Sequence, residues 1–395
     1  MACKTLKIGV FFDGTGNSME EIETYSNVAK LYDLYEEFKE RDVEGTVTTA
    51  VKHYEVGIGK GEGSSAIDMA SGAGGALRIS RMIDRVCATL DAHPYEDDLY
   101  KIRQIDIFGF SRGAALARDF VNTFYREVVR GPSKKYKDVR FNFIGLFDTV
   151  GSFGIPGNDI DYKPKDPYED SESIFSDNED DEDFEPYNFD LNAAQAKKIV
   201  HLVAKNELRA NFPLKSARGA ALEIECLGVH SDIGGGYGKS TKETLIDGRT
   251  KEHKIVRRVV GNDLSKVYLK LMYAYAKKYD VPFKDSSIEI TDDLIPYEKL
   301  ILSNPARISD IDDKEKERFL LKHAHQSATH IQVPAFGMAM AFVEPYIYLP
   351  ALLRLPKDLV EISAASNVAN YKNKSVYREI YPNRSGEAVL PKKSS

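Results

Sequence analysis

The chain has 395 residues, with 42% hydrophobic and 29% charged side chains, which is the balance of a globular protein. Its net charge of −7 argues against a nucleic-acid-binding surface, and no apolar run is long enough to span a membrane. The first residues lack the apolar core of a secretory signal peptide, so we expect a protein that is cytoplasmic when made. Three scattered cysteines, Cys3, Cys87 and Cys226, fit a reducing compartment with neither a disulfide framework nor a zinc site.

Short apolar runs alternate with helix-forming segments along most of the chain. In order, the pattern predicts a strand at 6–12, a helix at 28–39 with Asn27 as its N-cap, a strand at 47–55, a helix at 75–92, strands at 104–110, 140–147 and 222–229, and a helix at 264–279. His201 is expected to open a further helix. This alternation predicts an α/β fold with a mainly parallel sheet flanked by helices, in which chemistry gathers at the carboxyl ends of the strands.

Two unusual segments interrupt or follow this pattern. Residues 166–185 are densely acidic, which is typical of a solvated loop and marks an insertion at about 160–190; calcium binding is the weaker alternative. Residues 335–355 are apolar and could form a lid, a membrane contact or a partner contact, or simply core. We therefore divide the chain into a catalytic domain at 1–330 and a C-terminal apolar segment and tail at 331–395, with residues 385–395 expected to be frayed.

The most informative motif is Gly109-Phe110-Ser111-Arg112-Gly113, which lies between an apolar run and an Ala/Leu-rich helical run. This is the G-x-S-x-G pattern of a nucleophile elbow, where a sharp strand-to-helix turn presents a serine hydroxyl. The two glycines remove side chains that would collide in the turn. The alternative is an ordinary turn with glycines for packing, but the strand before and the helix after favour a nucleophile.

A nucleophilic serine needs a histidine base and a carboxylate that orients the histidine. Among the eight histidines, His230 follows a predicted buried strand and precedes a glycine run, which allows close approach of backbone and substrate. Asp148 ends the strand after the nucleophile strand and is the preferred acid, although it could instead cap a loop; Asp232 is the alternative acid. The order Ser111, Asp148, His230 matches that of α/β-hydrolases.

Two backbone sites could stabilise the oxyanion of such a reaction. The Arg112 N–H opens the helix after Ser111, and the loop Asp13-Gly14-Thr15-Gly16-Asn17 could offer the Gly14 or Thr15 N–H. That loop could also be only a tight turn. The glycine-rich run at 57–63 lacks the spacing of phosphate-binding motifs, so we expect no nucleotide, cofactor or metal.

Four sequence blocks carry a resemblance to a known family: Phe-Phe-Asp-Gly-Thr-Gly-Asn at 11–17, Gly-Phe-Ser-Arg-Gly-Ala-Ala at 109–115, Phe-Asp-Thr-Val-Gly-Ser at 147–152 and Gly-Val-His-Ser-Asp-Ile-Gly-Gly-Gly-Tyr at 228–237. They resemble the α/β-hydrolase domain that includes type VI secretion system phospholipase effectors of the first lipase-effector family. Weaker blocks lie at 201–209 and 264–265. The chain departs from the family pattern at Asn206-Glu207, in what is expected to be a helix, and at His325-Gln326-Ser327; neither departure touches Ser111, Asp148 or His230.

The resemblance implies an α/β-hydrolase-like fold and a serine esterase that cleaves acyl ester bonds of glycerophospholipids at a membrane surface. It also implies delivery by a secretion apparatus to the target-cell periplasm or membrane, and a neutralising immunity protein. Two alternatives remain: a serine hydrolase that acts on a non-lipid ester or thioester, and a non-catalytic interaction module with the same fold.

Overall fold

The structure, a computed structural model, describes residues 4–60, 74–94, 100–131, 135–151, 187–207, 212–247, 254–325, 378 and 380–390. Its centre is a seven-stranded sheet with the strand order β2-β3-β1-β4-β5-β6-β8. The strands are β1 (Lys4–Phe12), β2 (Phe38–Arg41), β3 (Val47–Glu55), β4 (Tyr100–Phe110), β5 (Arg140–Phe147), β6 (Ala196–Ala204) and β8 (Leu222–Cys226). All neighbours pair in parallel except β2 with β3, so the carboxyl ends of six strands lie at one edge.

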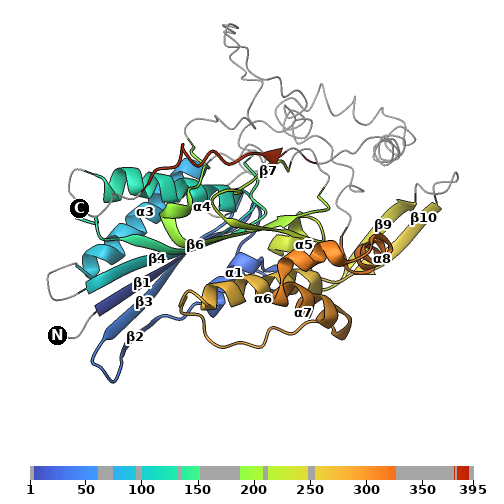
Figure 1. Cartoon of the computed structure of the whole chain (residues 1–395), viewed down its shortest axis with the longest axis horizontal. Helices are drawn as coiled ribbons and strands as arrows, with labels where there is room; N and C mark the ends of the chain where they lie inside the picture. Colours follow the sequence, from blue (N-terminus) through green and yellow to red (C-terminus); the bar gives the residue numbers. More distant parts are fainter. Residues whose placement is uncertain are drawn as a thin grey trace, which may run out of the picture.

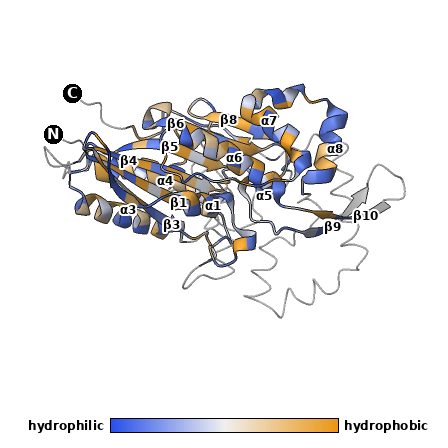
Figure 2. Ribbon diagram, turned by 90° about the horizontal axis from the view of Figure 1, so that it is seen from below, coloured by the Kyte–Doolittle hydropathy of each residue, from blue (hydrophilic) through white to orange (hydrophobic). Residues whose placement is uncertain are grey.

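Helices cover both faces of this sheet (Figure 1). One face carries α3 (Gly75–Ala92) and α4 (Arg112–Thr123), which continues as the π-helical η2 (Phe124–Val129); the other carries α1 (Asn27–Leu34), α6 (Asp263–Lys277) and α7 (Ile295–Ser303). Successive strand residues point to opposite faces, so Ile107 packs in one hydrophobic core and Phe108 in the other. Figure 2 shows the resulting pattern, with hydrophobic strands enclosed between the helices.

The remaining elements surround this layered centre. A short helix, α5 (His230–Gly234), follows β8, and the hairpin of β9 (Thr241–Asp247) and β10 (Lys254–Val260) extends away from the sheet (Figures 1 and 2). The outer helix α8 (Asp313–His323) has no buried residue. Short helical turns are η1 (Ile22–Thr24), η3 (Ala193–Gln195), η4 (Asp292–Leu294) and η5 (Pro305–Asp310). None of the helices in the described ranges has both the length and the apolar character needed to cross a membrane.

Residues 378 and 380–390, here called the C-terminal segment, pack against α4 and η3. Within this segment β11 (Ile380–Tyr381) pairs in parallel with β7 (Leu214–Lys215). The Val389 N–H donates to Asn122 Oδ1 at 2.8 Å, and Gln195 Nε2 donates to the Val389 carbonyl at 2.8 Å. The expectation of a frayed tail is therefore wrong for residues 385–390, because the Val389 backbone binds two buried amides and the Ser385 and Glu387 carbonyls accept from Asn192 and Asn188.

The structure confirms most predicted elements and corrects three. The N-cap of α1 is Ser26, whose Oγ accepts from the Ala29 N–H at 3.0 Å, and the helix stops at Leu34 because the chain then turns into β2. The strand predicted at 222–229 ends at Cys226. His201 does not open a helix: it lies inside β6, where its neighbours Val200 and Leu202 face a hydrophobic core.

Two sequence features lie outside the described residues. They are the acidic run at 166–185 and the apolar segment at 335–355. The division of the chain at residue 330 also falls outside the described residues and stays a prediction.

Candidate active site

Ser111 lies on a tight turn between β4 and α4. Its backbone has φ 58° and ψ −131°, a region that non-glycine residues rarely adopt, and its N–H donates to the Phe147 carbonyl at 3.0 Å. A Cβ atom at Gly109 would lie 2.6 Å from Ala114 Cα, and one at Gly113 would lie 2.2 Å from the Asp13 carbonyl oxygen. Both glycines of G-x-S-x-G are therefore required by close backbone contacts, as expected of a nucleophile elbow.

Asp148 and His230 meet at the same edge of the sheet. Asp148 directly follows β5 with a positive φ of 41°, and its N–H donates to the Leu202 carbonyl at 2.7 Å. His230 begins α5, and its Nδ1 lies 2.7 Å from Asp148 Oδ2. Both side chains are buried, which strengthens the hydrogen bond by excluding water. The structure therefore brings together the histidine and the preferred acid.

Aromatic and polar neighbours fix the position of the His230 side chain and backbone. The Phe110 ring lies 4.6 Å from the imidazole, centroid to centroid, and the Phe212 ring packs edge-on at 4.9 Å. The backbone N–H of His230 donates to Glu207 Oε2 at 3.1 Å. A Cβ atom at Gly234 would lie 1.9 Å from Phe110, so this glycine lets α5 approach the turn at Ser111. His230 thus packs against the residue that precedes Ser111.

The Asp148 carboxylate has two further partners. The Ala204 N–H donates to Oδ1 at 2.7 Å, and the guanidinium of Arg378 donates to Oδ2 at 2.7 Å and to Oδ1 at 2.5 Å. Burial alone would raise the pKa of Asp148, but the Arg378 charge and the hydrogen bonds from His230 and Arg378 outweigh it and lower the pKa well below its usual range. The carboxylate is therefore ionised at neutral pH, as an acid that orients a histidine must be.

The loop of residues 13–17 is held beside the turn at Ser111. The Gly14 N–H donates to Asp13 Oδ1 at 2.7 Å, and the Tyr54 hydroxyl donates to the other oxygen of the same carboxylate. Arg112 Nε donates to Thr15 Oγ1 at 2.8 Å. The structure therefore places Gly14, Thr15 and Arg112 together, but the Gly14 N–H already has an acceptor within its own loop.

The glycine-rich run that follows β3 supports this loop. The Gly57 N–H donates to the Asn17 carbonyl at 3.0 Å, and the Gly16 N–H donates to the Ile58 carbonyl at 2.9 Å. A Cβ atom at Gly57 would lie 1.8 Å from the Gly14 carbonyl oxygen. Position 57 requires glycine because the backbone there touches the loop of residues 13–17 and leaves no room for a side chain.

The alternative acid, Asp232, has a different partner. Its Oδ1 lies 2.6 Å from His325 Nδ1, and its Oδ2 accepts from the Val229 and His325 N–H groups at 2.9 and 3.0 Å. The His325 ring also stacks on Tyr237, with centroids 3.7 Å apart. Asp232 thus binds the start of the turn that leads into α5 and anchors residue 325 there.

Sequence reasoning missed several residues of this site. Arg378, Glu207 and Phe212 carry no motif that would have marked them as neighbours of Asp148 and His230. His201, expected at a helix start, instead binds Glu223 through Nδ1 at 3.1 Å and accepts from the Thr149 N–H through Nε2 at 3.2 Å. Over the described residues, no cluster of three or more His, Cys, Asp or Glu side chains could hold a metal ion.

The sheet order, the turn at Ser111 and the polar residues at the carboxyl ends of the strands define a protein with an α/β-hydrolase-like fold. The model of the family described as T6SS, phospholipase effector Tle1-like, catalytic domain matches residues 7–129 and 122–274. This match covers more than half of the chain, so the chain belongs to that family of type VI secretion system phospholipase effectors. The resemblance stated from the four sequence blocks is confirmed.

One solved structure supports this assignment at the level of the fold. The chain is similar to the Tle1 effector bound to the VgrG spike from the Type 6 secretion system, with a TM-score of 0.56 and 22% identity over 82% of this chain and 84% of that chain. An uncharacterized protein from Pseudomonas aeruginosa is similar with a TM-score of 0.44 and 18% identity, over 97% of this chain and 65% of that one. No protein of curated function is similar enough to count as a relative.

Proposed function

We propose that this protein is a serine esterase that hydrolyses acyl ester bonds of glycerophospholipids, with Ser111 as nucleophile, His230 as base and Asp148 as the acid. One observation carries the proposal: the 2.7 Å hydrogen bond between His230 and Asp148 lies at the edge of the sheet where Ser111 occupies its strained turn. Membership of a phospholipase effector family supports the substrate class.

Acylation follows from the hydrogen bonds of His230. Because Asp148 accepts the Nδ1–H, the neutral imidazole carries no proton on Nε2, and this nitrogen has the lone pair that a base requires. His230 Nε2 takes the Ser111 proton while Ser111 Oγ attacks the acyl carbonyl. The ionised Asp148 stabilises the imidazolium that forms. Collapse of the tetrahedral intermediate breaks the acyl ester bond, and His230 gives its proton to the departing lysophospholipid oxygen.

Deacylation reverses these roles with water as the nucleophile. His230 takes a proton from water as the water attacks the acyl-Ser111 ester, and it then returns a proton to Ser111 as the fatty acid leaves. The Arg112 N–H, at the first position of α4, stabilises the oxyanion in both steps because the N-terminal end of a helix carries a partial positive charge. We assign the second donor to Thr15, because the Gly14 N–H is bound by Asp13.

Hydrolysis of phospholipid vesicles tests this proposal. Vesicles of phosphatidylethanolamine and phosphatidylglycerol are incubated with the wild type or with Ser111→Ala, and mass spectrometry identifies the fatty acids and lysophospholipids that are released. We expect release by the wild type alone, and the acyl chain left on the lysophospholipid identifies the position that is cut. If neither protein releases product while a fluorophosphonate probe labels Ser111 of the wild type, the substrate is a non-lipid ester or thioester. An unlabelled Ser111 in the wild type overturns the nucleophile assignment and favours an interaction module.

The proposal extends to delivery. A Tle1 effector of similar fold is bound to the VgrG spike of its secretion system, and we propose that this protein likewise binds a spike protein and is carried to the periplasm or membrane of a target cell. A phospholipase delivered in this way requires an immunity protein in the producing cell. Co-purification of this chain with the spike protein encoded next to it tests the first partner, and rescue of poisoned cells by a neighbouring gene tests the second.

A further inference from the structure

We propose that Arg378, carried by the C-terminal segment, is a positioning residue for Asp148 and completes the active site. This inference rests on the proposed function and goes beyond it, because Arg378 lies outside residues 7–274, to which the catalytic-domain family matches. The active site of this chain therefore includes a residue that the family match does not contain.

The ion pair between Arg378 and Asp148 is bidentate. Arg378 Nη1 donates to Asp148 Oδ2 at 2.7 Å, Arg378 Nη2 donates to Asp148 Oδ1 at 2.5 Å, and Nη2 also donates to the Ala204 carbonyl at 3.0 Å. The planar guanidinium matches the two carboxylate oxygens and so fixes the rotation of the carboxylate plane. Oδ2 is then aimed at His230 Nδ1. Arg378 touches neither the serine nor the histidine in these contacts, so its action on the reaction passes through Asp148.

Charge gives Arg378 a second effect. A buried carboxylate is costly unless it is paired, and only 6% of the surface of Arg378 is exposed, so its charge is barely screened by water. The positive charge holds Asp148 ionised, and it also opposes a second positive charge on His230. Over the described part of the chain, the other ionisable groups that act on this pair include Glu207, Glu223, His201 and Cys226, and the two glutamates also act on Arg378.

The C-terminal segment brings Arg378 to this place through contacts of its own. Asn383 Nδ2 donates to the Leu191 carbonyl, and Asn383 Oδ1 accepts from the Leu191 N–H, both at 2.8 Å. Lys215 Nζ donates to the Pro382 carbonyl at 2.9 Å. The segment thus docks against β7 and the residues before η3 through contacts other than the ion pair, and docking delivers the guanidinium to Asp148.

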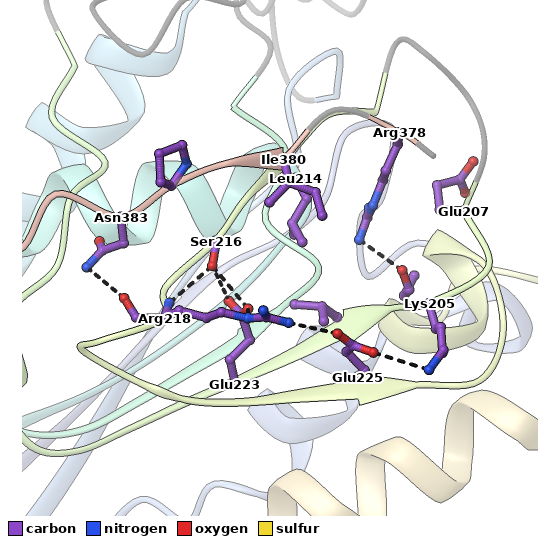
Figure 3. A pocket seen from close by; sticks show the side chains of 13 residues that line it. Lys205, Glu207, Leu214, Ser216, Arg218, Glu223, Glu225, Arg378, Ile380 and Asn383 are labelled. Carbon is purple, nitrogen blue, oxygen red and sulfur yellow. Dashed lines mark hydrogen bonds and ion pairs between the residues drawn. The ribbon is translucent and has the colours of Figure 1, made fainter. Parts of the chain in front are cut away.

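A pocket with a volume of about 390 Å³ lies next to Arg378, which forms part of its wall together with Ala204, Glu207 and Ile380 (Figure 3). Figure 3 shows the Arg378 side chain reaching toward the end of β6 beside this space. The pocket gives a small cation a route to the position of the guanidinium if the side chain is shortened. This allows a chemical test of the role of Arg378.

The first experiment compares Arg378→Gln with Arg378→Lys. For Arg378→Gln we expect kcat/KM to fall by about tenfold or more, yet less than the ~10⁴-fold loss expected when the acid itself is removed. The acidic limb of the kcat/KM profile, which reports protonation of His230, should move to higher pH because a repelling charge is gone. Arg378→Lys keeps the charge, so the acidic limb of its profile should stay at the wild-type pH. Its kcat should fall, because a single ammonium nitrogen cannot make the two parallel hydrogen bonds that fix the carboxylate plane.

The second experiment is chemical rescue. Guanidinium ion, added at a concentration too low to unfold the protein, should restore kcat to Arg378→Ala but not to Asp148→Asn, which lacks the carboxylate that the ion must bind. Thermal unfolding of every variant checks that the fold is retained. If Arg378→Ala unfolds, the kinetic comparison of Arg378→Lys with Arg378→Gln decides whether Arg378 positions Asp148.

The outcomes separate this proposal from the one on which it rests. An unshifted pH limb in Arg378→Gln, or the absence of rescue in a folded Arg378→Ala protein, would overturn the positioning role. The rate of Ser111 labelling by a fluorophosphonate serves as the activity if phospholipid is not the substrate. A wild-type protein whose Ser111 is not labelled overturns both proposals.

Discussion

The backbones of Ser111 and Asp148 are linked: the Ser111 N–H donates at 3.0 Å to the carbonyl of Phe147, the residue before Asp148. Both residues also have a positive φ, 58° and 41°, and of the non-glycine residues that the structure describes only Asp280 shares this property. Such backbone strain costs about 1–3 kcal/mol per residue and is concentrated at functional sites. The fold therefore holds the proposed nucleophile and acid in one strained corner at the carboxyl ends of β4 and β5.

Substitution of Ser111 should separate activity from stability. Ser111→Ala and Ser111→Gly should each lower hydrolysis by about 10⁴-fold or more, because both lack the hydroxyl. Ser111→Gly should be more stable than Ser111→Ala by about 1 kcal/mol, because glycine adopts a positive φ without strain. Urea unfolding of the two variants measures the difference. Asp280→Gly is the control: it should gain stability and keep full activity, and equal stabilities of the two Ser111 variants would contradict the strain argument.

The two candidate acids can be told apart by substitution with asparagine. Asp148→Asn should lower kcat by about 10⁴-fold, because the amide cannot hold His230 in the reactive tautomer. Asp232→Asn should mainly lower the free energy of unfolding, because Asp232 binds His325 and the Val229 N–H rather than the His230 ring. Steady-state kinetics and thermal unfolding of both variants make the comparison. A larger loss of kcat in a folded Asp232→Asn protein would exchange the roles of the two acids.

Gly57 offers a test of the loop contact beside the nucleophile turn. Gly57→Ala should lower the free energy of unfolding by about 1–3 kcal/mol and reduce kcat, because its Cβ would meet the Gly14 carbonyl oxygen at 1.8 Å and displace the loop that carries Thr15. Gly238→Ala is the matched control, since among the described residues no atom beyond its two chain neighbours lies within 4 Å of a Cβ at Gly238. Chemical denaturation and kinetics should show an effect for the first variant only.

Asp106 predicts a specific pH dependence of stability. Burial raises the pKa of Asp106 to about 7, even though Asn142 and Tyr35 donate hydrogen bonds that lower it. In the unfolded chain the pKa is about 3.9, so between pH 4 and 7 the folded state binds more protons at this site and stability falls as the pH rises. Asp106→Asn removes this loss of stability at higher pH, because asparagine does not titrate.

Measuring the free energy of unfolding of the wild type and of Asp106→Asn at several pH values isolates the contribution of the Asp106 carboxyl. At pH 8 Asp106→Asn should be more stable than the wild type by about 1–3 kcal/mol, and the advantage should shrink toward pH 4. Asp119, whose pKa burial raises to about 6, contributes equally to both proteins and cancels in the difference. A constant difference across this range would show that Asp106 does not titrate as expected.

Docking of the C-terminal segment should be coupled to catalysis through Arg378. Asn383→Ala removes both hydrogen bonds to Leu191 and should lower kcat, because Arg378 then occupies its position for less of the time. In the Arg378→Gln background the same substitution should change kcat little, since the segment no longer delivers a guanidinium. A double-mutant cycle on kcat measures this coupling, and additive effects would show that docking acts on the site by another route.

Much of the local structure follows from the sequence alone. The strands at 47–55 and 140–147 and the helix at 75–92 have the predicted bounds, because the strands are short runs rich in β-branched and aromatic residues and the helix carries apolar side chains at helical spacing. The turn at Ser111 was also predicted, because two glycines at fixed spacing between a strand and a helix leave few conformations. His201 was wrongly placed because a buried central strand carries no period-2 pattern, and its polar side chain is satisfied by Glu223 and Thr149 from neighbouring segments.

The assembly of the site was decided by tertiary structure. Asp148 and His230 are 82 residues apart and Asp148 and Arg378 are 230 apart, and no local propensity connects them. Their meeting depends on the strand order, which places β4, β5 and β6 side by side, and on docking of the C-terminal segment. The sequence by itself determined which residues carry reactive groups and which turn presents the serine, because those are local properties of the chain. Only the fold decided that Asp148 rather than Asp232 faces His230, and that Arg378 neutralises the Asp148 carboxylate. The physical reason is that burial and pairing depend on residues far along the chain.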